Sequence, residues 1–270
     1  MSHLSYALRD ATTMLRRDVR HSLRNLSMTL SGLLTPVVTM ALFIYVFGGT
    51  LGAGLGRVAH GGAYINYVAP AIIIMTIGSG VSTTAVNLCM DMAEGIIARF
   101  RTMAIARASV LTGLVVGSMI RTMITNGIVI AVALLMGFRP SANLGAWLAA
   151  LGVIALFTLA LTWMAVVFGL IGKTPAGANG LSLIFQLILP FTSSAFVRPA
   201  SMPAGLRWFA EYQPFTPVID TVRGLLMGTP IGASAVLAVA WCIGLTVVGY
   251  LWARAVYNRN SVAYNLTSVR

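Results

Sequence analysis

Few residues in this sequence have the types and spacing that could support chemistry, and their neighbours argue against each such pattern. Gly172-Lys173-Thr174 looks like the end of a phosphate-binding P-loop. That motif needs a glycine at position 167, which is Val167 here, and a helix at once afterwards, where Pro175 stands. The three histidines are scattered and the six acids form no metal or acid–base set. We therefore expect no catalytic residue, no metal and no ATP site in this chain.

Charge pairing in an apolar setting is the chemistry that the stretch from Leu187 to Gly228 offers. It starts as an apolar helix, breaks at prolines and carries aromatic residues. Arg207 and Glu211 are four residues apart, and Asp220 and Arg223 are three apart, so each pair can form on one helix face. Irregular backbone at membrane depth is tolerated only where it is buried in protein or lines a cavity.

This stretch is therefore either an interfacial loop with an aromatic belt or a re-entrant gate that closes the outer end of a pathway. Two short helices are expected within it, the first capped by Ser201 and the second by Thr216. Gly228 is expected to end the second helix. The residues assigned to the outer gate are Pro190, Phe196, Pro203, Trp208, Glu211, Pro214, Pro217, Asp220, Arg223 and Gly228.

A second charged stretch runs from Asp91 to Arg107. Asp91 and Glu94 have the spacing of a capping box, with Asp91 as the N-cap. Apolar residues then share one helical face, with arginines beside it, which predicts a short amphipathic helix. Such a helix either lies on lipid or docks a cytosolic partner, which would need an apolar ridge surrounded by charges. The residues assigned to this docking role are Asp91, Glu94, Gly95, Arg99, Phe100, Arg101 and Arg107.

Arg121 is the one charge expected near the middle of a membrane span. An arginine there costs several kcal/mol unless it snorkels, pairs or faces water. It therefore either snorkels into the inner leaflet or faces an inner vestibule or a seam between subunits.

The elements that must position these residues are membrane helices. The chain is 58% hydrophobic and only 9% charged, against about 25% charged residues in soluble domains. Its net charge of +12 points to membrane topology and anionic lipid rather than to nucleic acid. Cys89 and Cys242 are expected to be free thiols. The fold class is all-α integral membrane, with six predicted transmembrane helices at about 29–47, 67–88, 114–136, 147–171, 181–190 and 233–254.

The N-terminal residues 1–27 read as a basic amphipathic helix that lies in the membrane interface, either as a topology anchor or as a partner contact. With the N-terminus inside, twelve basic residues fall on the inner side and five on the outer side. Both termini are thus expected in the cytoplasm, and the gate stretch outside. The five outer residues are Arg57, Arg139, Arg198, Arg207 and Arg223.

Two sets of residues carry a resemblance to a known family. One comprises Glu94-Gly95, Arg99-Phe100-Arg101 and Arg107, and the other is PFTSSAFV followed by MPAGLRWFAEYQPFTPVIDTVRGLLMG. Together they resemble the ABC-2 type transporter permeases, closest to the branch typified by daunorubicin-resistance permeases. The resemblance covers nearly the whole chain, with residues 28–270 as the ABC-2 transmembrane domain.

The resemblance implies a permease subunit of an exporter in the cytoplasmic membrane, pairing with a second permease copy and a separate ABC ATPase. ATP and Mg²⁺ would be cofactors of that partner and not of this chain. Asp91 to Arg107 would be the coupling helix, and residues 198–228 an outer re-entrant helical hairpin. The substrate would be a drug-like amphipathic molecule, or alternatively a lipid or polysaccharide. An ion-coupled secondary transporter is the rival from a different class, and it would favour several buried acids.

Overall fold

The computed structural model describes residues 26–46, 63–93, 107–197 and 199–267, and the side chains of 34–46, 64–93, 112–197 and 199–257. These parts of the chain are helical and contain no strand. The predicted all-α class is therefore confirmed for them. The predicted N-terminal amphipathic helix lies almost entirely outside the described residues and stays a prediction.

Four long helices dominate the structure: α4 (Ala63–Ala93), α6 (Arg107–Leu135), α7 (Leu144–Ile171) and α12 (Ser234–Thr267). Each has an apolar stretch long enough to cross a membrane. They coincide with the second, third, fourth and sixth predicted spans.

Two shorter apolar elements coincide with the first and fifth predicted spans. The first is α2 (Leu26–Ala41) with the π-helix η1 (Leu42–Val46). The second is α8 (Pro175–Leu183), continued by the π-helix η3 (Ile184–Ile188) and α9 (Leu189–Phe191). Length and composition thus give four membrane-crossing helices among the described residues, and a count of six rests additionally on these two shorter elements.

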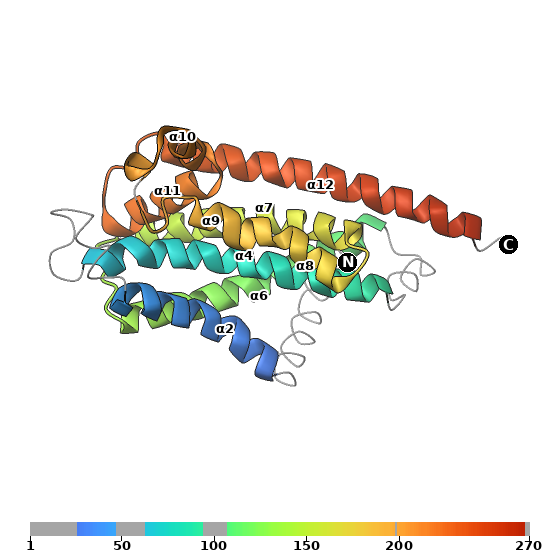
Figure 1. The fold of residues 1–270 in the computed structure, drawn as a ribbon, viewed down its shortest axis with the longest axis horizontal. Coiled ribbons are helices and arrows are strands. Elements are labelled where there is room, and N and C mark those ends of the chain that lie inside the picture. The colour runs from blue at the N-terminus through green and yellow to red at the C-terminus, as the bar shows by residue number, and fades with distance from the viewer. Residues whose placement is uncertain (1–25, 47–62, 94–106, 198, 268–270) are drawn as a thin grey trace, which may run out of the picture.

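The long helices run side by side, with α7 at the centre of the bundle (Figure 1). α7 contacts α4, α6, α8, α11 and α12. α4 contacts α2, α6 and η3 as well, so α4 and α7 together carry most of the buried core. α2 and α12 lie on opposite sides of the bundle (Figure 1).

Two glycines on α4 allow neighbouring helices to approach closely. A Cβ atom on Gly78 would lie 2.5 Å from the carbonyl oxygen of Phe185 in η3. A Cβ atom on Gly80 would lie 2.8 Å from the hydroxyl oxygen of Thr122 on α6. Small residues serve helix packing in membranes because lipid supplies no hydrophobic force between helices.

The helix formed by α8, η3 and α9 widens into a π-helix at η3, and this change has a local cause. Pro190 lies two residues after the end of η3, has no N–H to donate, and would clash with the carbonyl of residue 186 in a regular α-helix. The backbone responds with a π-turn, in which the N–H of Leu189 donates to the carbonyl of Ile184 five residues back.

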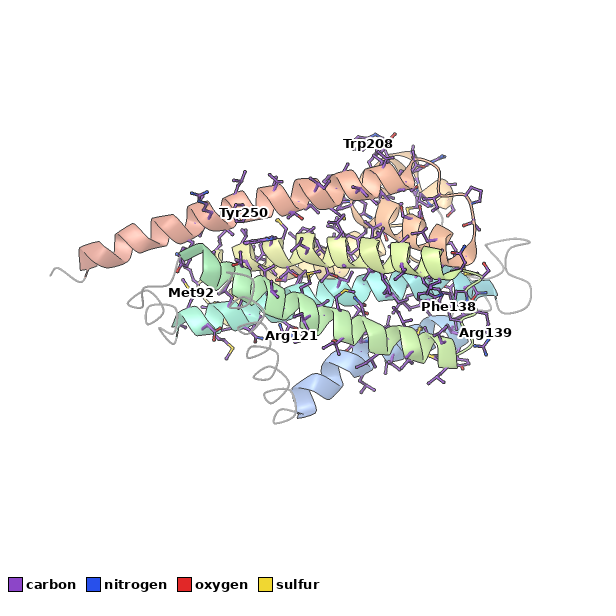
Figure 2. All side chains as sticks on the ribbon, turned by 180° about the vertical axis from the view of Figure 1, so that it is seen from behind. Met92, Arg121, Phe138, Arg139, Trp208 and Tyr250 are labelled. Carbon is purple, nitrogen blue, oxygen red and sulfur yellow. The ribbon has the colours of Figure 1, made fainter. Side chains whose placement is uncertain are left out.

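The bundle has two distinct ends (Figure 2). Trp208, Phe138 and Arg139 lie at one end, Met92 lies at the other, and Arg121 lies between them. The first end holds α10 (Ala204–Tyr212) and α11 (Phe215–Met227). We call it the hairpin end, because these two helices form the proposed re-entrant segment.

Candidate functional site

The segment that leaves α9 folds into a compact unit at the hairpin end. It comprises a turn over 192–197, the short 3₁₀ helix η4 (Pro199–Ser201), α10, α11 and Gly228. We call residues 192–197 and 199–228 the hairpin. Its second helix, α11, is largely buried and contacts α4, α7 and α12, whereas α10 is largely exposed.

Prolines set the starts of both hairpin helices, so the two predicted caps are wrong. Ser201 belongs to η4, and Pro203 takes the N-cap position of α10 without a side-chain hydrogen bond. Pro214 takes the N-cap position of α11, and Thr216 lies inside that helix. Proline fixes its own φ near the helical value and has no N–H that would need an acceptor, which suits it to the first turn.

The end of α11 is as predicted. Gly228 has φ 67° and its N–H donates to the carbonyl of Gly224, which is the left-handed conformation that glycine adopts without strain. The following turn returns the chain into α12. Ser141 in the loop between α6 and α7 donates its N–H to the carbonyl of Leu226 (3.0 Å), which fixes the end of α11 to that loop.

Arg223 is the centre of a polar network that joins the hairpin to α4. Its Nε donates to the backbone carbonyl of Tyr67 on α4 at 3.1 Å. One terminal nitrogen donates to Asp220 at 2.7 Å, and the other donates to the backbone carbonyl of Ser194 at 3.0 Å. The guanidinium also stacks 3.8 Å from the centre of the Tyr67 ring. Only 14% of the Arg223 side chain is exposed, so these contacts replace water rather than compete with it.

Ser194 and Tyr67 close the network from the other side. The Tyr67 hydroxyl donates to the carbonyl of Ser194 at 2.9 Å, and the Ser194 hydroxyl donates to Asp220 at 2.8 Å. The N–H of Ser194 donates to the Thr216 hydroxyl at 3.1 Å. The turn over 192–197, α11 and α4 are therefore held at one point by side chains from all three. We call Tyr67, Ser194, Thr216, Asp220 and Arg223 the clasp.

Asp220 is the acid of the clasp. Burial raises its pKa above the ordinary value, against the Arg223 charge and the hydrogen bonds from Ser194 and Arg223, which lower it. The side chain is still 36% exposed, so water reaches the carboxylate. Burial and pairing thus act on the pKa of this carboxylate in opposite directions.

The second predicted ion pair, Arg207 with Glu211, is also confirmed, but it is more exposed to water than the Arg223–Asp220 pair. Its nitrogen and oxygen lie 2.7 Å apart, the same separation as in the Arg223–Asp220 pair. Here, however, 50% of the Arg207 side chain and 41% of the Glu211 side chain are exposed. Such a surface pair contributes less than about 1 kcal/mol, and it has no contact with the clasp among the described hydrogen bonds.

Other predicted gate residues line the junction between the hairpin and the shorter helices. Phe196 is buried, stacks on Phe43 of η1 (centroids 3.9 Å apart) and lies 5.1 Å from the Phe191 ring. Pro190 is buried in α9, and Pro217 is buried in α11. Trp208 is the exception, because it is 67% exposed on α10.

The predicted docking stretch is described only at its two ends. α4 continues through Asp91 to Ala93, so Asp91 lies in the last turn of that helix and is not the N-cap of a new one. The apolar helix simply extends further than its hydropathy suggested. Arg107 begins α6. Glu94, Gly95, Arg99, Phe100 and Arg101 lie outside the described residues, and their role stays a prediction.

Arg121 lies in the middle of α6, about 21 Å from its first residue at 1.5 Å per residue. It is half-buried, and its guanidinium lies 3.5 Å from the Ser118 hydroxyl. Five residues further along α6, Asn126 is 1% exposed, and neither its amide nitrogen nor its oxygen has a hydrogen-bond partner among the described residues. No spacing in the sequence marked Asn126.

Gly172-Lys173-Thr174 is a connection between two helices and not a P-loop. Gly172 ends α7, and the Thr174 hydroxyl accepts from the N–H of Gly177 as the N-cap of α8. Pro175 occupies the first turn of α8. A P-loop would instead follow a strand and wrap a phosphate with consecutive N–H groups.

Three clasp residues are not predicted from the sequence. Tyr67 begins a predicted span, Thr216 is a predicted cap, and no pattern distinguishes Ser194. Their partners are 22 to 156 positions away in sequence. Only Tyr67 has a partial sequence signal, because a tyrosine near the end of a span commonly lies at the membrane interface.

These features define a helical membrane protein whose hairpin is anchored to a spanning helix. The model of the ABC-2 type transporter family matches residues 9–227, and the chain belongs to that family.

It is 24% identical over 214 residues to the daunorubicin resistance ABC transporter permease protein DrrB1 of Streptomyces coeruleorubidus, covering 79% of this chain and 71% of that protein. It is 26% identical over 212 residues to the probable doxorubicin resistance ABC transporter permease protein DrrC of Mycobacterium tuberculosis, covering 78% and 76%. The chain is thus an ABC transporter permease with drug-resistance relatives, as its sequence predicted.

Proposed function

We propose that this chain is the membrane-spanning subunit of an ATP-driven exporter that moves a hydrophobic or amphipathic, drug-like substrate out of the cell. The observation that carries the proposal is the clasp, which fixes a proline-rich hairpin to the end of a spanning helix in a chain of this family. Two relatives are named for resistance to daunorubicin and doxorubicin, and we extend that substrate class to this chain.

In this proposal the hairpin is the outer gate. The Arg223 side chain binds α4 and the turn over 192–197 at once, so the gate opens only when these hydrogen bonds are exchanged. The hairpin end is then the outer end, both termini are cytoplasmic, and α2 and the α8–α9 element complete six spans. A cysteine at Ala204, which is exposed on α10, should react with an impermeant maleimide added outside intact cells. Reaction only in inverted vesicles would reverse the orientation.

The coupling stretch supports energy input from the opposite end. α4 ends and α6 begins around residues 94–106, and Met92 lies at the end opposite the hairpin (Figure 2). Movement of residues 94–106 by a partner would thus act on two helices of the bundle together. Full reversal of an inward–outward equilibrium, from 1:99 to 99:1, needs about 5.5 kcal/mol, which a separate ABC ATPase would supply.

A second permease copy has an apolar surface available. The exposed large apolar side chains on α2 and η1 include Leu34, Val38, Leu42, Tyr45 and Val46, and those on α8, η3 and α9 include Leu181, Leu183, Ile184, Leu187, Ile188 and Phe191. The Phe43–Phe196–Phe191 contacts join the two elements. A substrate would pass between two copies by alternating access.

The deciding experiment is purification of the tagged chain from its native membrane in mild detergent, followed by transport in vesicles. We expect an ABC ATPase to co-purify at about one to one and nucleotide-dependent uptake of an anthracycline into inverted vesicles. Reversing the charges of Arg99 and Arg101 and truncating Phe100 should abolish co-purification while membrane insertion persists. Transport by the chain alone would contradict the proposal and make Arg121 the first residue to test for ion coupling. Transport of a lipid or polysaccharide but no drug would keep the subunit role and change the substrate.

A further inference from the structure

We infer that the interface between α4 and α6 contains a water-binding site, centred on the side-chain amide of Asn126 and placed near the middle of the membrane. The inference rests on the packing of these two helices and on the membrane location of the chain. It does not rest on the proposed ATPase, substrate or gate.

Small and polar residues face each other along this interface. α4 and α6 are antiparallel, because Met92 near the end of α4 and Phe138 just after α6 lie at opposite ends of the bundle (Figure 2). The close approach of Gly80 to the Thr122 hydroxyl fixes the register of the two helices. A residue one turn before Gly80 on α4 therefore faces a residue one turn after Thr122 on α6. We define the seam as Thr76, Gly80 and Thr84 on α4 with Ser118, Thr122 and Asn126 on α6.

Asn126 differs from buried hydroxyl residues in how its hydrogen bonds are met. The Thr76 hydroxyl donates to the carbonyl of Ile72 at 2.9 Å, and the Thr221 hydroxyl on α11 donates to the carbonyl of Pro217 at 2.6 Å. Each of these hydroxyls is thus satisfied within its own helix. Asn126 is as deeply buried, yet neither its nitrogen nor its oxygen has a partner among the described residues. A dry amide in an apolar setting is costly, because its donors and its acceptor both lose water.

A water molecule is the partner that this geometry admits. Asn126 is 1% exposed, so a lipid chain, a drug-like substrate or a second copy of the chain cannot reach its amide from outside. Thr122 lies one turn before Asn126 on α6, and Thr76 lies opposite it on α4 in the register set by Gly80. Hydroxyl oxygens accept as well as donate, so both can bind the same water as the amide. A buried water needs about two to four polar partners, and these three side chains supply them.

The site lies deep in the membrane, between two helices that flank the coupling stretch. Thr76 follows Tyr67 of the clasp by nine residues, which is about 14 Å along α4 at 1.5 Å per residue. Since the hydrocarbon core is about 30 Å thick, Asn126 lies near its middle. α4 ends and α6 begins around residues 94–106. Under the proposed coupling role of those residues, the water would exchange its hydrogen bonds as the two helices shift past each other.

The test is water-edited solid-state NMR on the full chain in lipid bilayers. Proton polarisation starts on water and passes to nearby protein protons, so a fast build-up reports bound water. The readout is the side-chain NH₂ signal of Asn126, which is assigned by its loss in Asn126→Leu, where the amide and its water are removed together. The exposed side chain of Asn143 gives the reference for a hydrated amide. The backbone N–H of Ala160, which is 0% exposed on α7, gives the reference for a dry core.

We expect the build-up at Asn126 to match that at Asn143 and to be several-fold faster than that at Ala160. Thr122→Val keeps the side-chain shape but removes a water partner, so it should slow the build-up at Asn126 several-fold. Thr221→Val, the matched control in the hairpin, should leave it unchanged. A build-up at Asn126 as slow as that at Ala160 would show a dry seam and would overturn the inference. Equal effects of the two valine variants would overturn it too, because the water would then lie outside the seam. Neither result depends on co-purification of an ATPase, so failure of the water site and failure of the proposed function are distinguishable.

Discussion

Replacing Arg223 by methionine should destabilise the protein far more than the same change at Arg207, although both arginines reach a carboxylate at 2.7 Å. Arg223→Met removes the donors to Asp220 and to the carbonyls of Tyr67 and Ser194. It also removes the contact with the Tyr67 ring. Arg207→Met removes one exposed pair.

The magnitude follows from these contacts. Three hydrogen bonds at about 1 kcal/mol each and one cation–π contact at about 0.5–1 kcal/mol give a loss of about 3–4 kcal/mol in the free energy of unfolding. Arg223→Lys should lose about half as much, because an ammonium keeps the charge but cannot reach three acceptors in one plane. Arg207→Met should lose less than about 1 kcal/mol.

The assay is a pair of double-mutant cycles in detergent, with unfolding driven by SDS and followed by near-ultraviolet circular dichroism. The cycle of Arg223→Met with Asp220→Asn should give a coupling energy of about 1.5 kcal/mol, since methionine alone leaves a partly buried carboxylate without its partner. The cycle of Arg207→Met with Glu211→Gln should give about 0.3–0.5 kcal/mol. Equal coupling energies in the two cycles would refute the reasoning, because burial would then have no effect.

Three further results are expected from the same unfolding measurement. Gly78→Ala should destabilise the protein by about 1–3 kcal/mol, because the added Cβ meets the Phe185 carbonyl oxygen. Gly127→Ala, which has open space around the added Cβ, should stabilise it by up to about 1 kcal/mol. Loss of stability in both variants would contradict the packing argument. Asn126→Leu should be neutral or stabilising, because its amide has no partner among the described residues, and a loss above about 2 kcal/mol would show that the amide is paired. Burial raises the pKa of Asp220 in the folded protein, so the protonated carboxyl favours folding. This contribution to the free energy of unfolding is complete below the ordinary pKa and is lost as the pH rises through the raised value. Asp220→Asn should remove this part of the pH dependence of stability, and an unchanged pH profile would contradict the argument.

Much of the fold could be predicted because its signal is local. Long apolar runs and the stop at Gly228 both act within a few residues of themselves. The i, i+3 and i, i+4 spacing likewise predicted both ion pairs of the hairpin. Helix ends were less accurate, since α4 continues to Ala93 through Asp91, where the sequence pattern suggested a new start.

The clasp could not be predicted because its geometry is non-local. Thr216 has the sequence position of a cap, yet its hydroxyl is used by the N–H of Ser194, 22 residues earlier. Arg223 reaches the carbonyl of Tyr67, 156 residues earlier. Which acceptor a side chain meets depends on how the helices pack, and one sequence alone contains no measure of that.

The clasp also explains why an arginine holds the hairpin rather than apolar packing alone. Lipid provides no hydrophobic force between helices, and the turn over 192–197 brings backbone carbonyls into a region with little water. Arg223 satisfies the Ser194 carbonyl of this turn, the Tyr67 carbonyl of α4 and the Asp220 carboxylate with one planar group. Breaking all of these contacts at once costs several kcal/mol, which is comparable with the roughly 5.5 kcal/mol needed to invert a two-state equilibrium. In the proposed mechanism, a hairpin held in this way would stay closed at rest and would lie within reach of ATP-driven opening.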